Sequence, residues 1–146
     1  MTRLLSIFLL FLVVASVSCG KRSATENATA EFLKFESLYK SGDVRIAEKA
    51  LLDYRERLTQ AQRQETRGID FDQAFAIVDA RLFLMYRVTG ETNRMEERYR
   101  SSVEAFRRSN LAKGRPPPEF NYASLTEVVE KFDRGLGVKW KQEKQP

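Results

Sequence analysis

The sequence predicts an all-α domain of antiparallel helical hairpins, with four main helices and a short C-terminal helix. Two observations carry this prediction. Apolar residues recur three and four positions apart in several long segments, which is the spacing of one helix face. Short turns that contain glycine separate these segments in pairs, as antiparallel neighbours require. The chain has one cysteine, so no disulfide can form within one copy and the domain must rely on packing.

The first hairpin is expected over residues 25–61, as a helix at 25–40 followed by one at 44–61. Gly42 is expected to end the first helix, and Asp43 to cap the start of the second. The apolar face of the first helix comprises Ala28, Phe32, Phe35 and Tyr39. That of the second comprises Val44, Ala47, Leu51, Tyr54, Leu58 and Ala61.

The segment 71–88 is apolar nearly all round, which predicts the central helix of the domain. Asp70 is expected to cap its start together with Gln73. Asp79 and Arg81 interrupt the apolar pattern. One interpretation is that they reach a narrow solvent-exposed edge of the helix or pair with neighbouring helices. The other is that they contact a ligand.

A fourth helix is expected after the turn at 89–93, with Asn93 and Glu96 as its capping box. Its expected apolar face is Met95, Tyr99, Val103 and Phe106. The other face carries Arg94, Arg98, Arg100, Arg107 and Arg108. These arginines either pair in solvent with Glu96, Glu97 and Glu104, or form a patch for phosphate or carboxylate groups. In the second case Arg94 and Arg98 are the candidate partner-binding residues.

Residues 110–121 contain a glycine and three consecutive prolines, which predicts an extended segment. A short fifth helix should follow, capped by Ser124 with Glu127 and stopped by Gly135. Residues 135–146 are expected to be a polar C-terminal tail that holds the only tryptophan, Trp140, between two lysines. Trp140 either folds back onto the core or serves an interface, where it is a third candidate partner-binding residue.

The two expected hairpins share a sequence repeat. Tyr39–Asp43 in the first recurs as Tyr86–Glu91 in the second, with one inserted residue. The unit from Tyr39 to Ala47, continued by Leu51 and Tyr54, resembles the turn and second helix of a tetratricopeptide repeat. Leu82, Tyr86 and Gly90 match the first helix and turn of the next unit, although Phe83 is bulky where that family has a small residue. The resemblance implies a helical scaffold that binds a peptide or a partner protein.

Residues 1–18 have the order of a secretory signal peptide: Arg3, then a mostly apolar run over 4–15, then small residues. The run is shorter than the ~20 residues that span a bilayer. The segment Ala15–Cys19 resembles the lipobox of bacterial lipoproteins. The resemblance implies cleavage before Cys19 and acylation of that residue, with chains such as palmitate. Residues 19–24 would then be a lipidated tether to a helical domain at 25–134.

The composition excludes several classes of function. The chain has no histidine, which removes imidazole general bases and histidine-containing metal sites, and it has no glycine-rich phosphate loop or nucleophile motif. We therefore expect neither an enzyme nor a cofactor. The formal net charge is +5, but export makes nucleic acid an unexpected partner.

Two functions remain as expectations. The first is a membrane-anchored envelope lipoprotein that acts as an adaptor or assembly factor for an envelope protein. The alternative is a module that binds an anionic lipid or wall polymer through the arginine-rich face. In the lipoprotein family, Gly20 after the cysteine favours the periplasmic face of the outer membrane where the source has two membranes.

Overall fold

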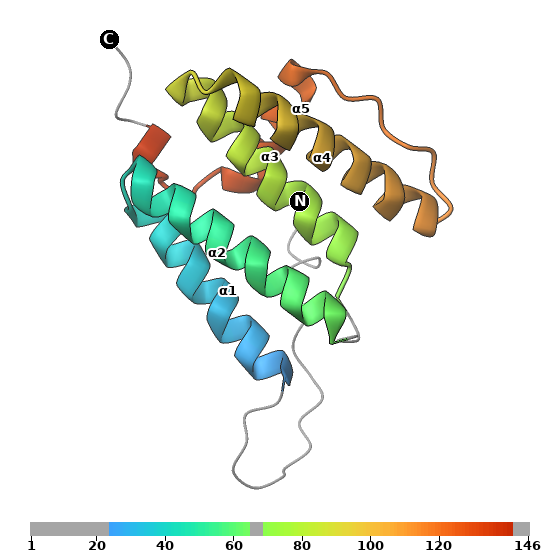
Figure 1. Ribbon diagram of the computed structural model, residues 1–146, viewed down its shortest axis with the longest axis horizontal. Helices are drawn as coiled ribbons and strands as arrows, with labels where there is room; N and C mark the ends of the chain where they lie inside the picture. Colours follow the sequence, from blue (N-terminus) through green and yellow to red (C-terminus); the bar gives the residue numbers. More distant parts are fainter. Residues whose placement is uncertain (1–23, 65–68, 142–146) are drawn as a thin grey trace, which may run out of the picture.

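The computed structural model describes residues 24–64 and 69–141, and this part of the chain contains helices and no strand. The helices form antiparallel hairpins, α1 with α2 and α3 with α4, and α2 packs against α3 (Figure 1). The predicted all-α hairpin architecture is confirmed. The elements are α1 (Ala24–Ser41), α2 (Val44–Arg63), α3 (Phe71–Thr89), α4 (Thr92–Ala112), α5 (Tyr122–Asp133) and a 3₁₀ turn, η1 (Lys139–Lys141).

The turn between α1 and α2 is closed by Gly42, as predicted. Its N–H donates to Leu38 O at 2.9 Å, and Asp43 then caps α2 by accepting from Ile46 N at 2.8 Å. A Cβ atom on Gly42 would lie 2.7 Å from Leu38 O and 2.5 Å from Ile46 Cγ2. Glycine is required here because the two helices leave no room for a side chain.

The turn between α3 and α4 corrects one predicted cap. Gly90 adopts a left-handed conformation, with φ 80°, and the Glu91 N–H donates to Tyr86 O at 2.9 Å. This tight closure brings the chain into α4 at Thr92, so Asn93 lies inside the first turn and does not cap the helix. Glu91 occupies the cap position without a side-chain cap bond, because its carboxylate is bonded to Arg94 and Thr89 instead.

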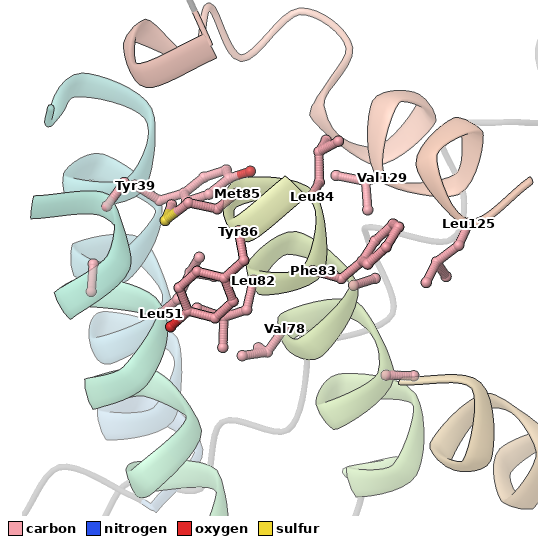
Figure 2. Packing of buried hydrophobic residues seen from close by; sticks show 14 of the residues in the cluster. Tyr39, Leu51, Val78, Leu82, Phe83, Leu84, Met85, Tyr86, Leu125 and Val129 are labelled. Atoms are coloured by element: carbon pink, nitrogen blue, oxygen red, sulfur yellow. The ribbon is translucent and has the colours of Figure 1, made fainter. Parts of the chain in front are cut away.

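Helix α3 is the centre of the domain, as its apolar sequence predicts. Every residue from Val78 to Tyr86 is buried. Figure 2 shows Leu82 and Tyr86 pointing toward Leu51 of α2, whereas Phe83 and Leu84 point toward α5. Asp70 caps the start of α3 by accepting from Gln73 N at 2.9 Å.

The inner face of α4 differs from the predicted one. Met95 and Tyr99 are only partly buried, and among the expected apolar residues only Phe106 is buried. Small residues fill the rest of the face, and the Ser102 hydroxyl donates to Ala76 O on α3 at 2.8 Å. This backbone contact requires a close approach of the two helices, which explains why small side chains replace large ones. The buried residues of α4 are Ser102, Ala105, Phe106 and Ser109.

The cap of α5 also differs from the prediction. Asn121, not Ser124, is the N-cap: its side chain accepts from Ser124 N, and the Ser124 hydroxyl accepts from Asn121 N, each at 2.9 Å. Asn121 follows an extended segment that begins after α4 ends at Ala112, and the Tyr99 hydroxyl fastens this segment by donating to Phe120 O at 2.6 Å. Ser124 is therefore the reciprocal partner in the capping box, the role that the sequence had suggested for Glu127.

Part of the expected polar tail belongs to the core. Gly135 and Gly137 take positive φ angles and turn the chain back, and η1 then packs against α1 and α2. Val138 and Trp140 are buried, and the Trp140 ring meets Tyr39 edge-on at 5.9 Å between centroids. Of the two interpretations of Trp140, the folded-back one is confirmed.

Candidate binding groove

A buried carboxylate joins three helices at the centre of the domain. The side chain of Asp79 on α3 has no exposed surface and accepts from Arg55 Nε of α2 at 2.8 Å. It also accepts from the Arg98 Nη1 of α4 at 3.3 Å and from the Ser101 hydroxyl at 2.6 Å. The interpretation that Asp79 pairs with neighbouring helices is confirmed. We call Asp79, Arg55, Arg98 and Ser101 the Asp79 cluster.

A second buried carboxylate, Asp133 at the end of α5, receives Arg81. The Arg81 Nη2–Asp133 Oδ1 distance is 2.8 Å, and the Lys141 Nζ–Asp133 Oδ2 distance is 2.9 Å. The Tyr39 hydroxyl donates to Asp133 Oδ2 at 2.5 Å. Burial, followed by the negative charge of Asp133, raises the pKa of Tyr39 far above its ordinary value, so the phenol keeps the proton that it donates. Each buried aspartate thus faces two cations and one hydroxyl.

Arg94 closes a third network at the start of α4. Its Nη2 lies 2.5 Å from Glu48 Oε1 of α2, and its Nη1 lies 2.8 Å from Glu91 Oε2. Its guanidinium carbon is 4.1 Å from the centroid of the Tyr86 ring, whose hydroxyl also donates to Glu48. Burial, followed by the hydrogen bond to Glu48, raises the pKa of Tyr86.

The arginine-rich face of α4 is therefore paired within the domain. Arg94 binds two glutamates, and Arg98 is only 17% exposed because it belongs to the Asp79 cluster. The remaining arginines also have carboxylate partners: Arg100 with Glu96, Arg107 with Glu104, and Arg108 with Asp72 and Glu104. This pairing leaves less unmatched charge for a polyanion than the sequence suggests. Trp140, the third candidate partner-binding residue, is 2% exposed and has no surface to offer.

An open groove of about 240 Å³ lies beside the Asp79 cluster. It is formed by the C-terminal halves of α2 and α4 and the N-terminal half of α3, which lie together at one end of the domain (Figure 1). Its walls are mostly polar, and two members of the Asp79 cluster, Arg55 and Ser101, take part in them. The lining residues are Arg55, Thr59, Gln62, Asp72, Phe75, Ser101, Ala105 and Arg108.

The sequence reasoning singled out Arg108 among these residues, as part of the arginine-rich face, but did not find the groove. The sequence does contain a pattern that corresponds to the groove. Arg55, Thr59 and Gln62 are spaced four and three apart on α2, and Ser101, Ala105 and Arg108 have the same spacing on α4. Such spacing places each set on one flank of its helix, beside the apolar stripe. What the sequence did not show is that the two flanks face each other.

Within residues 24–64 and 69–141, no group of three or more potential metal ligands comes together, and no helix is long and apolar enough to cross a bilayer. Cys19, the expected lipidation residue, and the expected signal peptide lie outside the described residues. Comparison of the chain with family models, curated proteins and solved structures found no match.

Proposed function

We propose that the protein is a lipid-anchored envelope protein whose helical domain is an adaptor for a partner protein. The observation that carries the proposal is the open groove between the two hairpins, which presents fixed polar side chains from three helices. The proposed anchor is an acylated Cys19, on the strength of the lipobox-like segment Ala15–Cys19. The proposed location is the cell envelope, at the periplasmic face of the outer membrane where there are two membranes.

The groove suits a segment of a partner better than a free metabolite. Its volume of about 240 Å³ lies below the ~300–1,000 Å³ of most small-molecule sites. Protein interfaces, in contrast, derive most of their binding energy from a few anchor side chains that enter small pockets. The Asp79 cluster holds the groove wall in place, because Arg55 is bonded to a carboxylate with no exposed surface. A wall fixed in this way loses little conformational entropy when a partner binds.

We expect a photo-reactive amino acid at Gln62 to capture one discrete partner in living cells. Gln62 is exposed and lines the groove, so a docked segment would lie within reach of its side chain. The measurement is the mass-spectrometric identification of the adduct of the tagged full-length chain. Lys131, exposed on α5 and away from the groove, is the matched control. Equal capture at both positions, or none at Gln62, would exclude the groove as a docking site.

We expect Cys19→Ser to release the protein from the membrane fraction or leave it as an uncleaved precursor. Each buried CH₂ of an acyl chain contributes ~0.8 kcal/mol to membrane binding, and the variant has no thiol to acylate. The measurement is cell fractionation together with the intact mass of the mature N-terminus. Ser18→Ala, which keeps the thiol and a small residue before it, should behave as the wild type. A wild-type N-terminus that is cleaved without added lipid mass would favour ordinary signal cleavage.

A further inference from the structure

The segment between α4 and α5 contains three consecutive prolines, at 116–118, which lie outside the groove. A proline ring fixes φ at about −65°, and a residue that precedes a proline is held in an extended conformation. Pro116 and Pro117 meet both conditions, since each is followed by another proline. Residues 115–120 belong to no helix or strand, and the described part of the chain has no cis peptide bond. Pro116 and Pro117 therefore adopt the polyproline II conformation.

The folded domain fixes both ends of this segment. At its start, the Arg115 N–H donates to Asn110 O of α4 at 2.9 Å. At its end, Phe120 packs on Phe106 of α4 with 5.0 Å between ring centroids, and its carbonyl accepts from the Tyr99 hydroxyl. Figure 1 shows the chain between these points at the outer edge of the domain. A segment that is already ordered in this way loses little conformational entropy when it binds.

The segment presents apolar rings and free hydrogen-bond acceptors. Pro116 and Pro117 are exposed. Within residues 24–64 and 69–141, no backbone hydrogen bond uses the carbonyl oxygens of residues 115–119. The prolines have no N–H, so the segment lacks the donors that pairing with a sheet edge requires. An aromatic groove matches it better, because tryptophan and tyrosine supply both ring surface and an N–H or O–H donor.

Opposite charges mark the two ends of the segment. Arg115 and Glu119 are exposed, and neither has an ion-pair partner in the described part of the chain, whereas the nearby Lys113 pairs with Asp70. The rings and carbonyl groups of a polyproline helix present a similar surface in both chain directions. A charge at each end can therefore set the direction of binding, through a carboxylate and a cation on the partner.

We propose that residues 115–119 are a docking element that binds an aromatic-lined groove of a partner protein. That groove carries a carboxylate at the end that receives Arg115 and a cation at the end that receives Glu119. The inference goes beyond the proposed function, because it assigns a second interaction surface and the kind of partner surface that fits it. It does not depend on the groove between α2, α3 and α4.

The test is capture by a photo-reactive amino acid at Ala123 of the tagged full-length chain in living cells. Ala123 is exposed in the first turn of α5, close to the segment in sequence, and it does not line the groove. We expect one discrete adduct, identified by mass spectrometry. Its yield should fall about tenfold or more when Pro116→Ala and Pro117→Ala are combined, because both rings are lost.

Two further variants test the charge at the start of the segment. Arg115→Gln should lower the adduct yield about tenfold, the loss expected for one charge-assisted contact. Arg107→Gln is the matched control, because Arg107 is an exposed arginine that is already paired with Glu104. Its adduct yield should equal that of the wild type. Circular dichroism of each purified variant should be unchanged, since the replaced side chains are exposed.

The captured protein provides the second measurement. When it is isotope-labelled and titrated with the full chain in a non-ionic detergent, its tryptophan or tyrosine side-chain NMR signals should shift saturably. Three outcomes would overturn the inference: no adduct at Ala123, an equal yield in the double proline variant, and no shift of aromatic signals. The Gln62 adduct should persist in the double proline variant. Absence of the Gln62 adduct in the wild type would contradict docking in the groove and leave this inference standing.

Discussion

Replacement of Asp79 by alanine should lower the free energy of unfolding by about 3–5 kcal/mol, as removal of one partner from a buried ion pair does. The substitution leaves the partly buried side chains of Arg55 and Arg98 without their shared carboxylate. It also removes the acceptor of the Ser101 hydroxyl. Domains of this size have only ~5–15 kcal/mol of stability, so the loss should be a large fraction of the total. Urea unfolding of the full chain, followed by circular dichroism, measures the loss.

Asp72→Ala is the matched control for this prediction. Asp72 lies on the same helix and also pairs with an arginine of α4, but its side chain is 30% exposed. The expected loss is about 0–1 kcal/mol, because solvent screens such a pair. If Asp79→Ala cost no more than Asp72→Ala, the Asp79 cluster would not be what joins α2, α3 and α4. Partial recovery of stability when Arg98→Met is added would show that the unpaired charge causes the loss.

The helices could be predicted from the sequence because their signals are local. The face with Phe35 and Tyr39, the capping residue Asp43 and the apolar run of α3 each lie within a few turns of helix. The two corrected caps, at Asn93 and Ser124, were displaced by only a few residues. In both cases a competing hydrogen bond of the adjoining turn decided where the helix begins.

The sequence predicts that buried charges need ion-pair partners, but it does not predict which residues those partners are. The sequence shows that Asp79 and Arg81 need partners, but their partners Arg55 and Asp133 are 24 and 52 residues away. Which residues meet at that range depends on how the hairpins pack against each other. The inner face of α4 could not be predicted for the same reason. Ser102 belongs to that face because its hydroxyl contacts the backbone of α3, and the sequence of α4 alone does not show this contact.

The internal repeat carried more structural information than its short length suggests. Tyr39 and Tyr86 occupy equivalent positions before the two turns, and both hydroxyls donate to a carboxylate. Both rings also lie under an arginine, Arg81 for Tyr39 and Arg94 for Tyr86, at 4.8 and 4.1 Å. The repeated tyrosine therefore marks a repeated contact, although the carboxylates and arginines come from unrelated positions. The tetratricopeptide resemblance itself stays a prediction, since no family model matched the chain.

Trp140→Ala should lower the free energy of unfolding by about 3–5 kcal/mol, the usual cost of truncating a large buried aromatic side chain. Trp140 is 2% exposed and packs against Tyr39, so its removal leaves a cavity between η1 and α1. The loss should also loosen the neighbouring pair between Lys141 and the buried Asp133. Urea unfolding followed by circular dichroism measures the change. Lys139→Ala, at the exposed neighbouring position, should stay within about 0.5 kcal/mol of the wild type.

The fluorescence of the wild-type protein gives an independent measurement, because Trp140 is the only tryptophan in the chain. A ring packed in the core should emit at short wavelength and resist quenching by acrylamide until the domain unfolds. An indole that is quenched as readily as free tryptophan, together with a Trp140→Ala variant as stable as Lys139→Ala, would contradict the folded-back segment. Trp140 would then be interpreted as an exposed residue, flanked by two lysines and available to a membrane or a partner.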